Sequence, residues 1–84
     1  MGNIHACLCC GMLTLDERGK FEICPECFWE DDDLQAADPH YTGGANAPSL
    51  NQARHNYMSF GACERRSLKH VRPPLPEERP PFNA

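Results

Sequence analysis

The chain has 84 residues, a formal net charge of −4 and six cysteines. A chain of this length forms one small domain that buries roughly 60–65% of its unfolded surface. Because so small a core contributes little stability, a bound metal ion would stabilise the fold substantially. The acidic balance does not favour general nucleic-acid binding, and no apolar stretch is long enough to cross a bilayer. The N-terminus lacks the basic and apolar regions of a signal peptide. We therefore expect a reducing, cytoplasmic setting rather than a secreted disulfide scaffold.

Two Cys-x-x-Cys motifs dominate the first third of the chain. They contribute Cys7 and Cys10, followed by Gly11, and then Cys24 and Cys27. Each tight turn presents two sulfur atoms, and two turns together surround a tetrahedral ion, so the pattern predicts a zinc site of the ribbon type. Iron is the alternative metal for this ligand set. Four thiolates leave no position for a substrate water, so we expect one structural Zn²⁺ and no enzymatic activity.

The other cysteines and the histidines do not add a second ligand set. Cys9 is expected to be unligated, because the adjacent Cys9 and Cys10 would chelate a single ion poorly. Cys63 is expected to be a packing residue, although Cys9 and Cys63 form a redox-active pair in an alternative hypothesis. The four histidines have no metal-ligand spacing. Only His5, two residues before Cys7, is placed to replace a ligand.

A β-hairpin is predicted between the two motifs. Apolar residues alternate in 13–15 and again in 21–23, as in two short strands. Residues 16–19 supply a turn, with Gly19 where a positive φ is expected. In this interpretation the two strands pair with one another and carry the metal ligands at their ends.

An aromatic and acidic segment follows the second motif directly, and consists of Trp29, Glu30, Asp31, Asp32 and Asp33. In the simplest interpretation, the ring caps the hairpin core and the carboxylates face solvent. The functional hypothesis is that these five residues form an edge that docks a basic protein surface, with the tryptophan as its anchor.

One amphipathic helix is predicted over 49–60, after a loop at 30–48. Ser49 is a favourable N-cap, and Gln52 three residues later makes a capping box. Gly61 is placed to end the helix. The apolar residues form a single stripe that is expected to dock on the hairpin near the tryptophan: Leu50, Ala53, Tyr57 and Phe60.

The chain after the helix is cationic and then rich in proline. Residues 62–72 form a basic segment, and 72–82 contain five prolines in eleven residues, which predicts extended structure. The sequence leaves open whether this extended segment wraps the domain or forms a free tail. The predicted organisation is therefore a single zinc-ribbon-like domain over 1–72, with the cysteine motifs and hairpin at 7–29, and an extended tail over 73–84. The fold class is a small metal-stapled α+β domain with rubredoxin-like knuckles.

The chain resembles the bacterial cysteine-rich CPCC family of small zinc-ribbon-like domains. The matching segments, in order, are CLCCG (7–11), LDERG (15–19), ICPECFWEDD (23–32), GGAN (43–46), SLNQAR (49–54), FG (60–61) and VRPPLP (71–76). Leu8 replaces the proline for which the family is named. Position 8 carries no metal ligand, so this difference concerns the stiffness of the turn. The resemblance implies a single-domain protein and no particular reaction.

Three classes of function fit these features. The first is a non-enzymatic interaction module for a protein with a basic surface, such as an immunity or inhibitor protein for a toxin. The second is a zinc-ribbon nucleic-acid-binding or transcription-associated regulator, because residues 43–84 hold six basic against three acidic residues. Its basic face would comprise Arg54, Arg65, Arg66, Lys69 and Arg72, together with the Tyr57 ring. The third is a rubredoxin-like iron protein or a dithiol redox protein.

Overall fold

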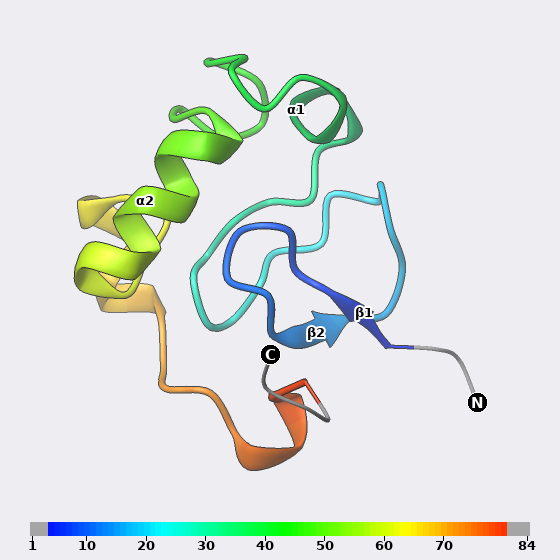
Figure 1. Cartoon of the computed structure of the whole chain (residues 1–84), viewed down its shortest axis with the longest axis vertical. Helices are drawn as coiled ribbons and strands as arrows, with labels where there is room; N and C mark the ends of the chain where they lie inside the picture. Colours follow the sequence, from blue (N-terminus) through cyan, green and yellow to red (C-terminus); the bar gives the residue numbers. More distant parts are fainter. Residues whose placement is uncertain (1–3, 81–84) are drawn as a thin grey trace.

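The computed structural model describes residues 4–80, in which two short hairpins lie beside one helix of three turns (Figure 1). The elements, in chain order, are β1 (His5–Ala6), β2 (Leu13–Leu15), α1 (Asp33–Ala37), α2 (Leu50–Phe60) and the 3₁₀-helices η1 (Arg65–His70) and η2 (Pro76–Glu78). No helix in this part of the chain is long and apolar enough to span a membrane.

The first cysteine motif lies at the tip of a small antiparallel hairpin. β1 pairs with β2, with His5 opposite Leu15 and Ala6 opposite Leu13, and the register is irregular between the two pairs. Leu15 is fully buried, which places this hairpin against the core.

The second cysteine motif lies at the tip of a similar hairpin, although its arms are too irregular to count as strands. The N–H of Phe21 donates to the Asp31 carbonyl (3.2 Å), and the N–H of Asp31 donates to the Glu22 carbonyl (2.9 Å). Ile23 and Glu30 form an isolated antiparallel bridge between these bonds and the motif.

The predicted pairing of 13–15 with 21–23 is therefore wrong. Each segment instead pairs with the chain on the other side of its nearest cysteine motif. Phe21 has a φ of 60°, in the left-handed region, so a regular strand cannot run through it. Gly19 has the expected positive φ, of 71°, in the turn that connects the two hairpins.

Helix α2 agrees with the sequence pattern. The Ser49 hydroxyl accepts a hydrogen bond from the N–H of Gln52 (3.1 Å), and Gly61 ends the helix with a φ of 91°. Only this half of the predicted capping box forms, and the Gln52 side chain is turned along the helix, where its Nε2 donates to Asn56 Oδ1 (2.8 Å). Leu50 and Ala53 are fully buried, and they pack with Trp29, Leu15 and the cysteines in one core cluster.

Helix α1 was not expected, because its five residues lie within the predicted loop 30–48. Asp32 is its N-cap and accepts a hydrogen bond from the N–H of Leu34 (2.8 Å). A helix of little more than one turn is too short to produce an apolar stripe in the sequence, so periodicity does not reveal it.

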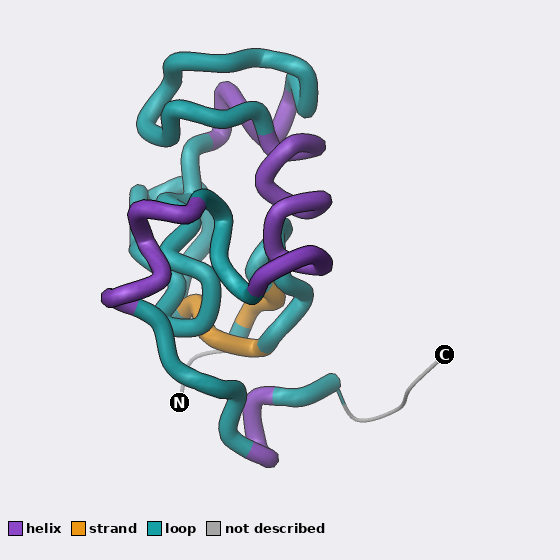
Figure 2. The backbone as a smooth tube through the Cα atoms, turned by 90° about the vertical axis from the view of Figure 1, so that its left-hand side faces the viewer, coloured by secondary structure: helices purple, strands orange, loops and turns teal. Residues whose placement is uncertain are grey.

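The C-terminal strap, residues 71–80, packs on the domain rather than leaving it (Figure 2). The N–H of Arg72 donates to the Pro25 carbonyl (3.2 Å), and η2 lies against β2. Of the two arrangements that the sequence leaves open for this tail, these contacts favour the one that wraps the domain as far as residue 80, whereas 81–84 lie outside the described residues. Val71 and Leu75 have the extended dihedral angles expected near prolines.

Replacing the cap of α2 should weaken the domain measurably. We expect Ser49→Ala to lower the free energy of unfolding by about 1 kcal/mol, because the N–H of Gln52 loses its acceptor. Urea unfolding measures this change. Ser59→Ala, at an exposed position on the same helix, is the matched control and should change stability by less than about 0.5 kcal/mol. Equal stability of the two variants would show that the cap contributes nothing.

Candidate metal centre

Four sulfur atoms meet where the two hairpins face one another. Those of Cys7, Cys10, Cys24 and Cys27 all lie within 4.8 Å of one another, and they form the one grouping of three or more metal-ligating side chains in residues 4–80. The Cys7 and Cys27 sulfur atoms are 3.6 Å apart, as are those of Cys10 and Cys24. A tetrahedral ion with metal–sulfur bonds of about 2.3 Å separates its ligands by roughly 3.8 Å. The spacing therefore fits one shared metal ion.

The backbone of both motifs follows the same pattern, which explains why the sulfur atoms converge. In the first motif, the N–H of Gly11 donates to the Cys7 carbonyl (2.8 Å), and in the second the N–H of Phe28 donates to the Cys24 carbonyl (2.8 Å). Gly11 and Phe28 occupy equivalent positions, and both have positive φ values, of 81° and 71°. Glycine adopts this conformation freely, whereas Phe28 pays a cost of about 1–2 kcal/mol.

Phe28 is held in its unusual conformation by packing. Its ring stacks on the His70 ring, with centroids 4.7 Å apart and planes 19° from parallel. The ring also packs against the buried core cluster. The turn of the second cysteine motif, which we call the second knuckle, is therefore anchored to η1 by an aromatic contact. The corresponding turn of the first motif, the first knuckle, cannot make such a contact, because Gly11 has no side chain.

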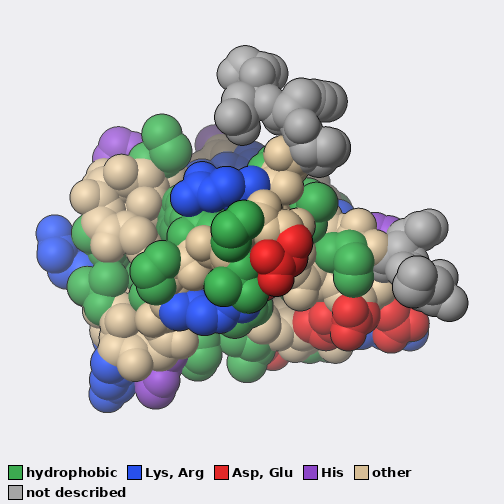
Figure 3. Space-filling model, turned by 90° about the horizontal axis from the view of Figure 1, so that it is seen from below, with side chains coloured by type: hydrophobic (Ala, Val, Ile, Leu, Met, Phe, Trp, Pro, Cys, Tyr) green, Lys and Arg blue, Asp and Glu red, His purple; other side chains and the backbone are tan. Residues whose placement is uncertain are grey.

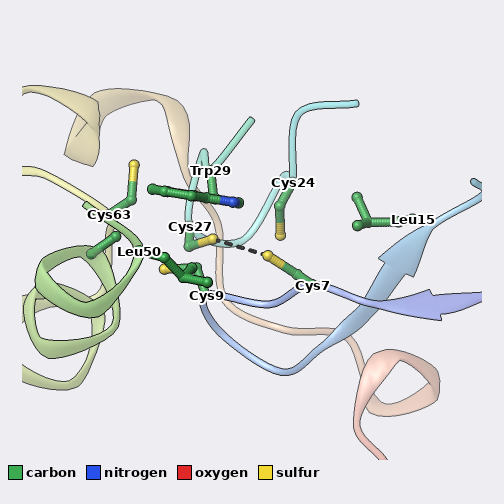
Figure 4. Packing of buried hydrophobic residues seen from close by; sticks show 9 residues of the cluster. Cys7, Cys9, Leu15, Cys24, Cys27, Trp29, Leu50 and Cys63 are labelled. Carbon is green, nitrogen blue, oxygen red and sulfur yellow. Dashed lines mark hydrogen bonds between the residues drawn. The ribbon is translucent and has the colours of Figure 1, made fainter. Parts of the chain in front are cut away.

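The burial and the ionisation of the thiols favour a bound cation. Cys7, Cys24 and Cys27 are buried and Cys10 is half-buried, and Figure 4 shows the labelled sulfur atoms of the three buried residues pointing toward a common centre. Hydrogen bonds from neighbouring thiols, that of Cys10 first, hold the pKa of Cys24 well below its ordinary value. The neighbouring thiols, Cys10 again first, raise the pKa of Cys27. Four thiolates at this spacing repel one another, so all four ionise together only around a cation.

Two donors outside the ligand set reach the Cys24 sulfur. The Thr14 hydroxyl donates to it at 3.1 Å, and the N–H of Glu26 donates at 3.4 Å. Such donors stabilise a thiolate and orient it toward a metal. Sequence reasoning missed Thr14. The alternation of residues in β2 indicates that Thr14 faces away from Leu13 and Leu15. It does not indicate that the Thr14 hydroxyl contacts the Cys24 sulfur.

Removing the Thr14 hydroxyl should weaken metal binding without destroying the site. We expect Thr14→Val to lower metal affinity by about tenfold or more, because Cys24 loses a hydrogen bond that supports its thiolate form. Competition with a chromophoric chelator measures the affinity. Thr42→Val, at an exposed loop position, is the control and should bind metal as the wild type does. Equal affinities in the two variants would contradict a role for Thr14.

The remaining cysteines and His5 lie outside the four-sulfur group. Cys9 and Cys63 are both buried in the core, and the Cys63 thiol donates to the Ser67 hydroxyl (4.0 Å). Burial raises the pKa of Cys63 to about 12, so this thiol is a poor nucleophile near neutral pH. His5 lies in β1 and pairs across to Leu15.

The acidic segment does not form the predicted docking edge. Trp29 and Asp31 are each 1% exposed and Asp32 is 6% exposed, while Glu30 is half-buried and only Asp33 faces solvent. The prediction of an exposed edge was wrong because carboxylates are normally solvated, and most of the internal partners of these two carboxylates are distant in the sequence.

Those partners are backbone N–H groups and one arginine. The Asp31 carboxylate accepts from the Arg18 guanidinium (3.1 and 3.2 Å) and from the N–H of Gly19 (2.7 Å). The Asp32 carboxylate accepts from the N–H of Leu34 and also from that of Ala45 (2.9 Å). The Asp31 carboxylate therefore attaches the turn that connects the two hairpins to the second hairpin. The Asp32 carboxylate attaches α1 to the loop before α2.

A buried pair of amides completes the attachment of that loop. The Gln35 side chain, 0% exposed, donates to the carbonyls of Tyr41, Asn46 and Pro48 at 2.9–3.2 Å. Its Oε1 accepts from both the main chain and the side chain of Asn46. A Cβ on Gly44 would lie 2.6 Å from the Asp32 carboxylate, so only glycine fits there. These hydrogen bonds replace regular secondary structure in the loop.

Glu26, between the ligands of the second motif, is enclosed by the C-terminal strap. Its side chain is fully buried, and Oε2 lies 2.9 Å from Arg72 Nη1. Arg72 in turn makes two hydrogen bonds to Glu78, at 2.7 and 2.9 Å. Burial and the nearby Glu78 carboxylate raise the pKa of Glu26 to about 7, although Arg72 opposes the shift. These contacts hold the strap across the second knuckle.

Comparison with models of protein families identifies the family of this chain. No curated protein matches the chain. The model of the family described as Cysteine-rich CPCC matches residues 5–78, a range that contains both knuckles, the buried acid and amide contacts and α2. Within the first motif, Leu8 packs against the core cluster, and its carbonyl accepts from Arg54 Nε (2.8 Å). With its metal-binding cluster intact and nearly its whole length matched, the chain belongs to the cysteine-rich CPCC family.

Proposed function

We propose that this protein is a non-enzymatic domain that holds one structural Zn²⁺ and acts by binding a protein partner. The observation that carries the proposal is the closed four-sulfur cluster. All four ligands of a tetrahedral ion come from the chain, so no position remains for a substrate or an activated water. Zinc is the ion that most commonly occupies such a site in structural domains.

The metal ion contributes a large share of the stability of this fold. The paired strands have only two and three residues, and each knuckle supplies half of the ligands. A structural zinc site contributes on the order of 10 kcal/mol, which equals the whole stability of a typical domain. The ion therefore joins the two hairpins, and through the cysteines it supports the core beneath α2.

The cationic residues give less support to nucleic-acid binding. Most of those in the predicted basic face already have partners within the chain. Arg54 donates to the Leu8 carbonyl (2.8 Å), and Arg65 lies over the Phe60 ring (4.5 Å). Arg66 pairs with Glu64 (3.2 Å), and Arg72 pairs with Glu78 (2.7 Å). One face of the molecule shows acidic side chains gathered toward one side and basic ones among hydrophobic groups (Figure 3). A patterned surface of this kind favours a protein partner.

The dithiol alternative also has little support. Cys9 and Cys63 are enclosed in the core, and the other four cysteines form one metal-ligand set rather than a free dithiol pair. A basic protein, such as a toxin held by its immunity protein, remains the partner that best suits the net charge of −4.

Binding assays with the zinc-loaded protein test this proposal. After nuclease treatment of a host lysate, we expect the immobilised protein to retain a basic protein in stoichiometric amounts. The metal-free protein should not retain it. In parallel, random-sequence DNA and RNA oligonucleotides should show no mobility shift at low salt. Nucleic-acid binding that weakens steeply with salt, and retention that is lost after nuclease treatment, would overturn the proposal.

A further inference from the structure

We propose that the groove between α2, η1 and the C-terminal strap receives a basic side chain of the protein partner, an arginine or a lysine. The inference rests on the proposed interaction function and specifies the part of the surface that recognises the partner. The groove has a volume of about 280 Å³, just below the range that is typical of small-molecule sites, which suits one long side chain better than a cofactor.

The walls of the groove are apolar. They come from Tyr57, Phe60, Leu68, Val71, Pro73 and Pro74. Leu68 is 41% exposed at the rim, so the groove is open to a partner. The Phe60 ring, one of these walls, already holds a guanidinium group elsewhere on its surface, because Arg65 lies over it at 4.5 Å.

The floor of the groove carries an incompletely satisfied carboxyl group. Glu26 lines the groove, and neither of its buried oxygen atoms accepts a hydrogen bond from any residue in 4–80. Arg72 is close to Oε2, at 2.9 Å, but its side-chain hydrogen bonds go to Glu78 and to the Pro73 carbonyl. Two carboxyl groups therefore share one guanidinium. Buried carboxyl oxygens are normally hydrogen-bonded, so this arrangement lacks one cationic donor.

An arginine or lysine side chain has the chemistry that this groove lacks. Its methylene stem would lie against the apolar walls while its charged head approaches Glu26. Arg72 covers Glu26 in the free protein, and it can turn toward Glu78, to which it is already bonded, as the new cation enters. Glu26 would then exchange a poorly aligned ion pair for charge-assisted hydrogen bonds.

Small probes test the groove independently of the partner. We would titrate the zinc-loaded full chain with hexylammonium and butylguanidinium and follow backbone amide shifts by NMR. We expect saturable shifts at Gly61, Leu68 and Val71. Hexanol, which is neutral, and hexanoate, which is anionic, should bind at least about tenfold more weakly, because they cannot supply the missing charged donor.

Three variants complete the test. Glu26→Gln should weaken hexylammonium binding by about tenfold or more, whereas the control Glu77→Gln, an exposed acid on the same strap, should not weaken it. Because Glu26 lies between two metal ligands, Leu68→Trp provides a second route. It should fill the groove and abolish probe binding while zinc content stays at one ion per chain.

Equal binding of hexanol and hexylammonium, or unchanged binding by a folded Glu26→Gln protein, would overturn the inference. So would binding of hexylammonium that survives Leu68→Trp. If the probes fail while zinc-dependent retention of a basic protein persists, the groove assignment fails and the interaction function stands.

Discussion

Replacing Cys24 by serine is expected to remove the metal ion and unfold the domain, whereas replacing Cys9 by serine should do neither. Cys24 belongs to the four-sulfur cluster, and Cys9 lies outside it although it is only two residues from Cys7. Loss of a structural zinc site costs on the order of 10 kcal/mol, which matches or exceeds the stability of a small domain. Cys9→Ser places a hydroxyl in the core and should cost only about 1–3 kcal/mol.

Elemental analysis and circular dichroism of the two purified variants measure these outcomes. Cys9→Ser should keep one zinc per chain and a cooperative thermal transition. Cys24→Ser should contain no zinc and show no such transition. The reverse pattern, with zinc lost from Cys9→Ser and kept by Cys24→Ser, would overturn the assignment of the ligands.

The second large effect is expected at Asp31. We expect Asp31→Ala to lower the free energy of unfolding by about 3 kcal/mol, because Arg18 and the N–H of Gly19 lose their shared acceptor in a closed site. Asp33→Ala is the matched control from the same acidic run. Asp33 is exposed in the first turn of α1, so its loss should cost less than about 1 kcal/mol.

Urea unfolding at saturating zinc compares the two aspartates. If Asp31 faced a partner rather than the interior, both substitutions would leave stability almost unchanged. Equal small effects would therefore contradict the structural role of the buried carboxylate and revive the acidic edge as a docking surface.

Local signals in the sequence predicted the ligands and the main helix. The spacing of Cys7, Cys10, Cys24 and Cys27 identified the cluster, because each motif is a turn with fixed geometry. Ser49 and Gly61 marked the limits of α2 for the same reason, since capping depends on a few neighbouring residues.

Features that depend on distant partners were not predictable. Alternation in 13–15 and 21–23 showed which side chains share a face, but not which segment each would pair with. The burial of Asp31 depends on Arg18, thirteen residues earlier, and that of Glu26 on a strap almost fifty residues later. A charged residue is expected in solvent until such a partner is known, so the acidic segment was assigned to the surface.

Zinc K-edge X-ray absorption, applied to the wild-type protein purified without added metal, measures the metal centre directly. We predict one zinc ion per chain, coordinated by four sulfur atoms at about 2.3 Å. A zinc shell that contains nitrogen or oxygen, iron in place of zinc, or a folded protein without metal would contradict a structural zinc site formed by Cys7, Cys10, Cys24 and Cys27.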